Sequence, residues 1–401
     1  MKKAAILLFI CLLCVLLPGM AGAKDFGVIL DQSVGYGGIG NDSSVDFTGA
    51  LIPRFSNLLG EKGEIYISMG IIAEYENENW FFVPELLRTD FTWLFGFGDF
   101  KAGRMYYSDP LGFIATGLFD GARISVNSEL GTFSFGAWYT GLLHKKRANI
   151  AMTPREQQYF SLKLDLNDLP NTYFAPRRIV SALDWEHLSL GGPLQVRVTL
   201  LGQFDLYGGE RLHSQYAAGK ITLPLDVFAF DLGGCLELIE DGGSFGTALA
   251  AELGIRVAPP TPLQDTLSLI ARYSSGLNGG GQLTAFLPVS TVAQGEVFEV
   301  KLSGISLVSL DYIARLHRTF SAGISSTYFI RSDLETYTEY PLSVKSDGYF
   351  LGNEFFCRLM WNPYSDLQLN LGGGVFLPSL GNAAPGADMM WRVEFSFVFG
   401  F

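Results

Sequence analysis

The sequence has few cysteines and no long apolar run beyond its first 23 residues. Of four cysteines in 401 residues, Cys11 and Cys14 fall in the apolar N-terminal segment, and only Cys235 and Cys357 lie beyond it. Two cysteines far apart in sequence do not indicate a disulfide framework. After residue 23 no apolar stretch approaches the roughly 20 residues that a transmembrane helix needs. The sequence therefore predicts neither a disulfide-rich protein nor a helical membrane protein.

Positive charge and histidine are also scarce. The chain has 28 Lys and Arg against 40 Asp and Glu, which gives a net charge of −12. A negative balance offers no electrostatic support for nucleic-acid binding, so no nucleic-acid partner is expected. The four histidines, which show no metal-ligand spacing, are His144, His187, His213 and His317. We therefore expect no metal site.

Motifs that carry chemistry are few. The stretch "GYGGIG" at 35–40 fits G-x-G-x-x-G, but polar residues and another strand follow it instead of a helix, so it predicts a hairpin turn. His213 and Ser214 are adjacent in a strand-like segment and point to opposite faces, which separates a nucleophile from its base. We expect no catalytic residue, no cofactor and no enzymatic activity.

The first 23 residues are typical of a secretory signal peptide. Lys2 and Lys3 precede an apolar run over 4–17, and small residues follow at Ala21 and Ala23. The run is too short to cross a bilayer, which argues against a membrane anchor. We expect cleavage after Ala23, which leaves a single domain over 24–401.

Apolar residues alternate with polar ones throughout that domain. In "PLQVRVTLLGQFDL" (193–206), Val196, Val198 and Leu200 share one face, and Arg197 and Thr199 share the other. Segments of about ten such residues, separated by turn residues, are typical of a transmembrane β-barrel with lipid outside and water inside. A β-sandwich would also alternate, but charges recur on the polar face and aromatics at the strand ends.

The alternation of apolar and polar residues predicts nineteen candidate strands. It therefore predicts an all-β fold. A single-chain bacterial barrel needs an even number, and interpretations from the two termini conflict between 156 and 193. We expect one antiparallel transmembrane barrel of about 18 strands, between about 16 and 20. The candidate segments are 25–36, 45–54, 63–75, 79–95, 98–107, 119–128, 131–142, 156–166, 177–190, 194–206, 212–224, 227–239, 245–257, 265–275, 296–315, 318–331, 350–361, 366–377 and 390–401.

The last segment, "WRVEFSFVFGF", places Phe395, Phe397, Phe399 and Phe401 on one face. Alternating aromatics that end in phenylalanine resemble the C-terminal signal by which bacterial outer-membrane barrels are recognised for assembly. The resemblance implies residence in the bacterial outer membrane, with membrane lipid and the barrel-assembly machinery as partners.

Two further patches resemble porins of the alginate-export family. The first, within 84–126, carries Gly103, Arg104, Phe119, Asp120, Gly121, Ala122 and Arg123. The second, within 351–381, carries Glu354, Phe376 and Pro378, but Ser379 stands where the family usually has glycine. The resemblance covers about a fifth of the chain and implies an outer-membrane porin whose solutes include anionic ones.

Alternation also places charges on the predicted lumenal face. The arginines are Arg197, Arg256, Arg272, Arg315, Arg331, Arg358 and Arg392, and the acids include Glu252, Asp311, Glu354 and Glu394. Two interpretations stay open: a balanced lining fixed by cross-strand ion pairs, or an arginine-rich wall that favours anions, because guanidinium stays charged and matches carboxylate geometry.

The sequence thus predicts an outer-membrane porin for passive passage of small hydrophilic solutes, including anionic or carbohydrate-type ones. A surface adhesin, or a structural barrel without dedicated transport, is the alternative, because long loops could bind partners. The solute and the direction of transport are not determined by the sequence.

Overall fold

The computed structural model describes residues 24–401 apart from 77–78, 166, 209–210, 279–282, 338–341, 343 and 345–346. The predicted signal peptide, 1–23, lies outside the described residues.

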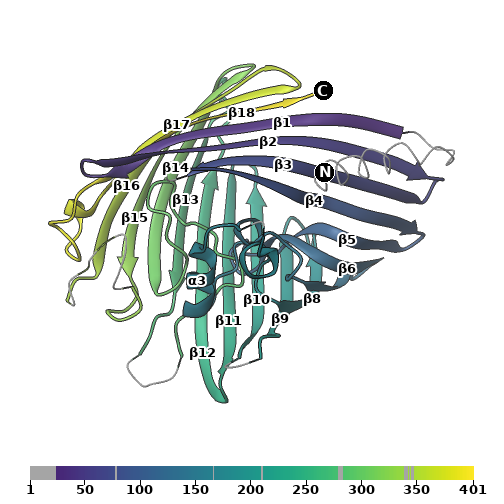
Figure 1. Cartoon of the computed structure of the whole chain (residues 1–401), viewed down its shortest axis with the longest axis horizontal. Coiled ribbons are helices and arrows are strands. Elements are labelled where there is room, and N and C mark those ends of the chain that lie inside the picture. Colours follow the sequence, from purple (N-terminus) through teal and green to yellow (C-terminus); the bar gives the residue numbers. More distant parts are fainter. Residues whose placement is uncertain are drawn as a thin grey trace.

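Eighteen strands form one closed antiparallel sheet, in which β1 pairs with both β2 and β18 (Figure 1). Every other strand pairs with its two neighbours in the chain, so the sheet is an up-and-down barrel. The expected fold and strand number are confirmed. The strands are β1 (Lys24–Ile39), β2 (Asp42–Leu59), β3 (Gly63–Glu76), β4 (Asn79–Phe95), β5 (Gly98–Ser108), β6 (Thr116–Ser128), β7 (Gly131–Tyr139), β8 (Arg178–His187), β9 (Gln195–Asp205), β10 (Leu212–Leu225), β11 (Phe228–Asp241), β12 (Ser244–Val257), β13 (Thr266–Ser274), β14 (Ile305–His317), β15 (Phe320–Arg331), β16 (Phe350–Tyr364), β17 (Leu367–Leu377) and β18 (Met390–Gly400).

The apolar and polar residues that alternate in the sequence lie on opposite faces of the barrel wall. Along β9, Leu200 and Phe204 are exposed on the outside, and Thr199 and Gln203 are buried inside. This alternation follows from the two-residue period of a strand. The outer wall is therefore apolar and the inner wall carries the polar side chains, as in transmembrane barrels.

Closure joins the two ends of the chain. β1 pairs with β18 from Ile29↔Gly400 to Ile39↔Met390, and the backbone of Phe401 exchanges hydrogen bonds of 2.6 and 2.9 Å with that of Val28. Tight connections such as 96–97, 318–319 and 365–366 lie at the end of the barrel that holds both termini. The long segments lie at the other end, which is the arrangement of periplasmic turns and outer loops.

One predicted strand is a helix. Residues 156–166 were expected to be extended, but α3 (Pro154–Ser161) lies there, between β7 and β8. Thr153 accepts a hydrogen bond from the Glu156 amide, and the Glu156 side chain bonds back to the Thr153 amide, with Pro154 in the first turn. This capping box starts a helix in spite of the alternating residues that follow. The error lies in the region where the two interpretations conflicted.

Another boundary is also shifted. The expected strand 296–315 begins only at Ile305, because residues 296–304 belong to a long connection. The other short helices among the described residues are α2 (Lys145–Ala148), α4 (Leu169–Thr172) and the 3-10 helix η1 (Pro378–Leu380). All of them lie in the long connections of the outer end.

Candidate functional site in the barrel lumen

Three connections fold inward and pack against the lumenal wall: the β5–β6 connection (109–115), the β7–β8 connection (140–177) and the β13–β14 connection (275–304). Their apolar residues form one buried cluster with lumenal residues of β5 to β12. Phe113 and Phe286, for example, make an edge contact at 6.2 Å between ring centroids, and both are almost fully buried. These connections therefore narrow the lumen and set the shape of any solute pathway.

A buried carboxylate organises the β5–β6 connection. Asp109 accepts hydrogen bonds from four backbone amides, those of Leu111 at 2.8 Å, Gly112 at 3.0 Å, Ile114 at 2.9 Å and Ala115 at 3.0 Å. Burial nevertheless raises the pKa of Asp109 above its usual range. The four bonds fix the turn that carries Phe113 into the lumen.

An ion pair holds α3 to the wall. Arg178 at the start of β8 is fully buried and donates to Glu156 at 2.6 Å and to Gln203 at 2.6 Å. Asp205 lies 3.7 Å from the same guanidinium. A buried charge is tolerated only when it is paired and hydrogen-bonded, as this one is. Glu156, which completes the capping box of α3, thus also anchors this helix to the wall.

Two wall carboxylates hold the β13–β14 connection. Glu237 accepts from the Leu287 amide at 2.8 Å, and the Tyr216 hydroxyl donates to the Leu287 carbonyl at 2.6 Å. From β16, Glu354 accepts hydrogen bonds from the backbone amides of residues 296, 297 and 298 at 2.8, 2.9 and 2.7 Å. The family-motif residue Glu354 is therefore an anchor for an inward segment.

A charged network lies between the wall and that connection. Glu252 accepts from Arg272, directly opposite it on β13, and from Lys220, each at 2.8 Å. Arg272 also donates to Gln294 at 3.0 Å and lies 5.5 Å from the ring centre of Phe113. Arg272 thus links the wall to two inward connections.

The other six predicted lumenal arginines lie on different strands and have different surroundings. Three have acidic partners: Arg197 with Glu186 at 3.4 Å, Arg358 with Asp311 at 2.8 Å, and Arg392 with Glu394, Glu299 and Asp46 at 3.0, 3.3 and 3.6 Å. Arg315 and the buried Arg331 lie near strand ends, where Arg315 donates to Gln264 at 2.9 Å and Arg331 donates to the Gly348 carbonyl at 2.9 Å, among its other contacts. Arg256 is exposed on β12. The structure does not gather these arginines into one patch.

The other family-motif residues have structural contacts. Arg104 and Asp120 form a bidentate pair with both bonds at 2.8 Å. Phe119 is buried, and a Cβ at Gly121 would lie 2.1 Å from the Ala137 carbonyl. Arg123 donates to Ser134 at 3.0 Å. In the second patch, Phe376 stacks on Phe298 at 4.3 Å, and Pro378 is buried in η1.

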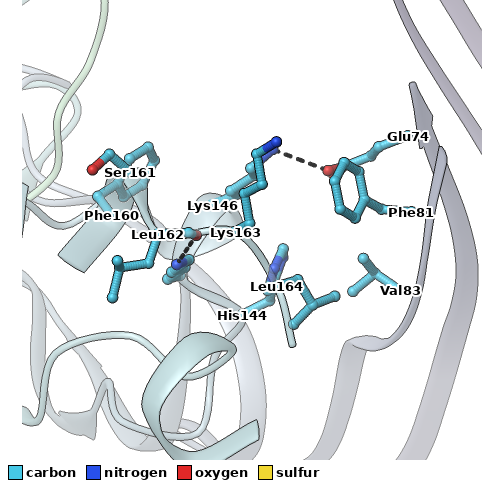
Figure 2. A pocket seen from close by; sticks show the side chains of 11 residues that line it. Glu74, Phe81, Val83, His144, Lys146, Phe160, Ser161, Leu162, Lys163 and Leu164 are labelled. Carbon is cyan, nitrogen blue, oxygen red and sulfur yellow. Dashed lines mark hydrogen bonds and ion pairs between the residues drawn. The ribbon is translucent and has the colours of Figure 1, made fainter. Parts of the chain in front are cut away.

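A cavity of about 180 Å³ lies between β3–β4 and the β7–β8 connection (Figure 2). Glu74 and Phe81 line one side, and Lys146 and Lys163 line the other, with an ion pair of 3.2 Å between Lys146 and Glu74. His144 borders the cavity, and burial together with the nearby Lys146 lowers the pKa of His144 to about 4. The imidazole is therefore neutral at pH 7.

Among the residues that the structure describes, no group of His, Cys, Asp and Glu is arranged to hold a metal ion. No helix within the described ranges is long and apolar enough to cross a membrane. Cys235 and Cys357 are both free.

No family model and no curated protein matches the sequence. The fold does match solved structures. OccK2 (OpdF) of Pseudomonas aeruginosa aligns with a TM-score of 0.62 at 11% identity, over 94% of this chain and 98% of that chain. OccAB1 of Acinetobacter baumannii aligns with a TM-score of 0.60 at 9% identity, over 94% and 97%. This chain shares their fold.

OccK2 has also been solved with glucuronate, and OpdK of Pseudomonas aeruginosa, an outer membrane protein, with vanillate. OccD3 of the same organism aligns with a TM-score of 0.58 at 12% identity, over 96% of this chain and 93% of that chain. These neighbours correct the expected family. The resemblance to alginate-export porins is wrong, although both groups are β-barrels, because short motifs such as Gly103-Arg104 meet packing needs of a barrel wall and do not specify a family.

Several residues of the lumen were missed by sequence reasoning. They are Asp109, Lys145 to Arg147, Glu156, Arg178 and Glu237. Only two local signals pointed to them: the capping box "TPRE" at 153–156, and the basic run "HKKR" at 144–147. The others became visible only once the inward fold of the connections was known.

Proposed function

We propose that this barrel is a bacterial outer-membrane channel for passive passage of small hydrophilic solutes, including anionic ones. The observation that carries the proposal is the contrast between the two wall faces. The outer wall exposes apolar side chains such as Leu200 and Phe204, and the inner wall carries ionised groups such as Glu252 and Arg272. Ionised groups on an inner wall require water or an ion partner. An aqueous channel supplies the water.

The solute class follows from the charges of the pathway and from the neighbours. Glucuronate and vanillate, found with neighbours of the same fold, are small carboxylates. In this chain Arg272 and Arg358 lie on the lumenal wall with one acid beside each. Guanidinium groups can bind a carboxylate in a bidentate manner while the neighbouring acid limits how long it stays. We propose that these arginines, with Arg197, Arg256, Arg315, Arg331 and Arg392, shape weak anion selectivity.

Placement in the outer membrane also implies a route for assembly. We propose that residues 1–23 direct export, and that the alternating phenylalanines of β18 are recognised by the barrel-assembly machinery. Phe395, Phe397 and Phe399 lie in register with Val34, Gln32 and Leu30 of β1. The segment that carries the proposed signal is thus also the one that closes the barrel.

Liposome swelling tests the proposal. Proteoliposomes that contain the full chain should swell in isotonic glucuronate and in isotonic small sugars, and control liposomes should not. A Gly103→Trp chain gives a misassembled control, because a Cβ at Gly103 would lie 1.9 Å from the Thr89 carbonyl oxygen. Liposomes that hold a correctly assembled barrel yet fail to swell in any of these solutes would contradict the channel and favour an adhesin or a structural barrel.

A further inference from the structure

A cavity of about 790 Å³, larger than that of Figure 2, lies at the outer ends of β7, β8 and β9. The end of β7 and the β7–β8 connection form most of its wall, and residues 205–208 at the end of β9 form the rest. We call it the outer cavity. Its volume is typical of small-molecule sites, which span about 300 to 1,000 Å³. None of its described lining residues lies on β13 or β16, the strands that carry the lumenal Arg272 and Arg358.

Most of the wall of the outer cavity is apolar or aromatic. Its four aromatic side chains are Tyr139, Tyr159, Phe174 and Tyr207. The Tyr159 hydroxyl donates to the Phe174 carbonyl at 2.7 Å, which holds α3 against the end of the connection. Aromatic side chains favour a planar ring as ligand, because two rings attract each other in offset or edge contacts. The wall therefore suits a compound that contains an aromatic ring.

The charge that a ligand in the outer cavity can reach is positive. Among the described lining residues, the charged ones are two acids and two arginines. The acids, Glu156 and Asp205, are at most 3% exposed and lie beside the buried Arg178. Arg155 is 41% exposed, and Arg177 is exposed as well. The two accessible guanidinium groups favour an anion.

Arg155 is held in place by the turn that follows β9. Asp205 accepts a hydrogen bond from the Tyr207 amide at 2.8 Å, which fixes this turn. The guanidinium of Arg155 lies 3.5 Å from the ring centre of Tyr207 and 3.6 Å from the Asp205 carboxylate. A cation over an aromatic ring is favourable. The side chain is thus oriented before a ligand arrives, which lowers the entropic cost of binding.

Arg177 lies beside Tyr139, and a glycine leaves the room for both side chains. A Cβ at Gly141 would lie 2.4 Å from the Tyr139 hydroxyl and 3.0 Å from Cγ of Arg177. In the part of the chain that the structure describes, no acid lies within 4 Å of the Arg177 guanidinium. An unpaired guanidinium can bind a carboxylate through two parallel hydrogen bonds. Arg177 is therefore the strongest candidate for direct contact with an anionic ligand.

We propose that the outer cavity binds aromatic carboxylates before they enter the lumen. The ring packs against the aromatic wall, Arg177 binds the carboxylate, and Arg155 adds positive charge beside it. A sugar acid fits less well, because several of its hydroxyls would face apolar side chains and lose their hydrogen bonds to water. This inference deepens the proposed passage of anionic solutes and rests on it.

Saturation-transfer NMR on the full chain in lipid nanodiscs tests the site, with empty nanodiscs as the blank. The probe is vanillate, an aromatic carboxylate. Vanillyl alcohol has the same ring without the charge, and cyclohexanecarboxylate has the charge without an aromatic ring. Vanillate should bind roughly tenfold more tightly than vanillyl alcohol, the effect of a charge-assisted hydrogen bond. It should bind about threefold more tightly than cyclohexanecarboxylate, the effect of an aromatic contact.

Arg177→Gln should weaken vanillate binding roughly tenfold. The matched control is Arg318→Gln, the same change at an exposed arginine in the turn between β14 and β15, at the other end of the barrel. It should leave vanillate binding unchanged. Equal binding of the three compounds, or equal losses in the two variants, would overturn the site.

Swelling of proteoliposomes in small sugars reports the channel separately from the site. Swelling without vanillate binding rejects the outer cavity as a binding site and leaves the channel standing. Vanillate binding that Arg177→Gln weakens, in a chain that gives no swelling, supports the site and rejects the channel.

Discussion

Arg178 donates to Glu156 at 2.6 Å inside the barrel, where both side chains are at most 3% exposed. Arg178 begins β8 and Glu156 lies in the first turn of α3, so the pair fixes an inward helix to the wall. Removing one partner of a buried pair leaves an uncompensated charge, whereas removing both is far less costly.

Arg178→Met should therefore lower the free energy of unfolding by about 3 to 5 kcal/mol. Arg197→Met is the matched control, because Arg197 and its partner Glu186 are 47% and 39% exposed, and such a pair contributes about 1 kcal/mol or less. Urea unfolding in detergent micelles, followed by tryptophan fluorescence, measures both. Equal losses for the two variants would show that Arg178 does not anchor α3.

Glu354→Gln should loosen the β13–β14 connection. The carboxylate accepts from three amides, and a neutral amide group replaces charge-assisted bonds with weaker ones. We expect faster hydrogen exchange at residues 296–298, by roughly tenfold or more. Glu296→Gln removes an exposed carboxylate that neighbours the same amides, and should leave exchange unchanged.

Acidification should weaken attachment of the β7–β8 connection. The pKa of His144 is about 4 in the folded protein, against about 6.5 for an unperturbed histidine. The unfolded state thus binds more protons between those values, so stability falls as pH drops from about 6.5 toward about 4. Limited proteolysis of 140–177 at pH 7 and pH 5 should show the loss. His144→Gln should reduce this pH dependence, whereas His317→Gln, at the exposed end of β14, should not. Equal behaviour of the two variants would contradict the assignment.

Deletion of Phe401 should impair assembly in cells. Its backbone pairs with Val28 at the point of closure, and it ends the proposed recognition signal. We expect loss of the heat-modifiable folded band in outer-membrane fractions and degradation in the periplasm. Deleting Met389 and Met390 together alters the opposite end of β18 and serves as the comparison. Normal surface levels of the shortened chain would count against the signal.

The wall of the barrel was predictable because its rule is local. Strict alternation assigned Leu200 outward and Thr199 inward without any knowledge of neighbours. The same rule failed at 156–166, where a capping box at Thr153 and Glu156 starts a helix before an alternating stretch. The capping box is thus a stronger local signal than the alternation that follows it.

The charge pairs were harder to predict from the sequence, because they depend on strand register and on how far a side chain reaches across neighbouring strands. Glu252 pairs with Arg272 because the two are opposite in the β12–β13 ladder. Asp311 and Arg358 are separated by a whole strand, and they meet over Gly323, where a Cβ would lie 3.0 Å from the Arg358 side chain. The inward folding of the connections was also not predicted, because their apolar residues do not recur with the spacing of a strand or a helix.

Single-channel recording in planar bilayers tests most directly whether the lumen is a water-filled pathway. The purified chain should give discrete conductance steps in KCl, with a reversal potential in a salt gradient that indicates weak anion preference. Asp311→Asn, which frees Arg358, should shift that potential further toward anions, and Asp366→Asn at an exposed turn should not. Correctly folded barrels that insert into the bilayer without conductance steps would contradict the channel.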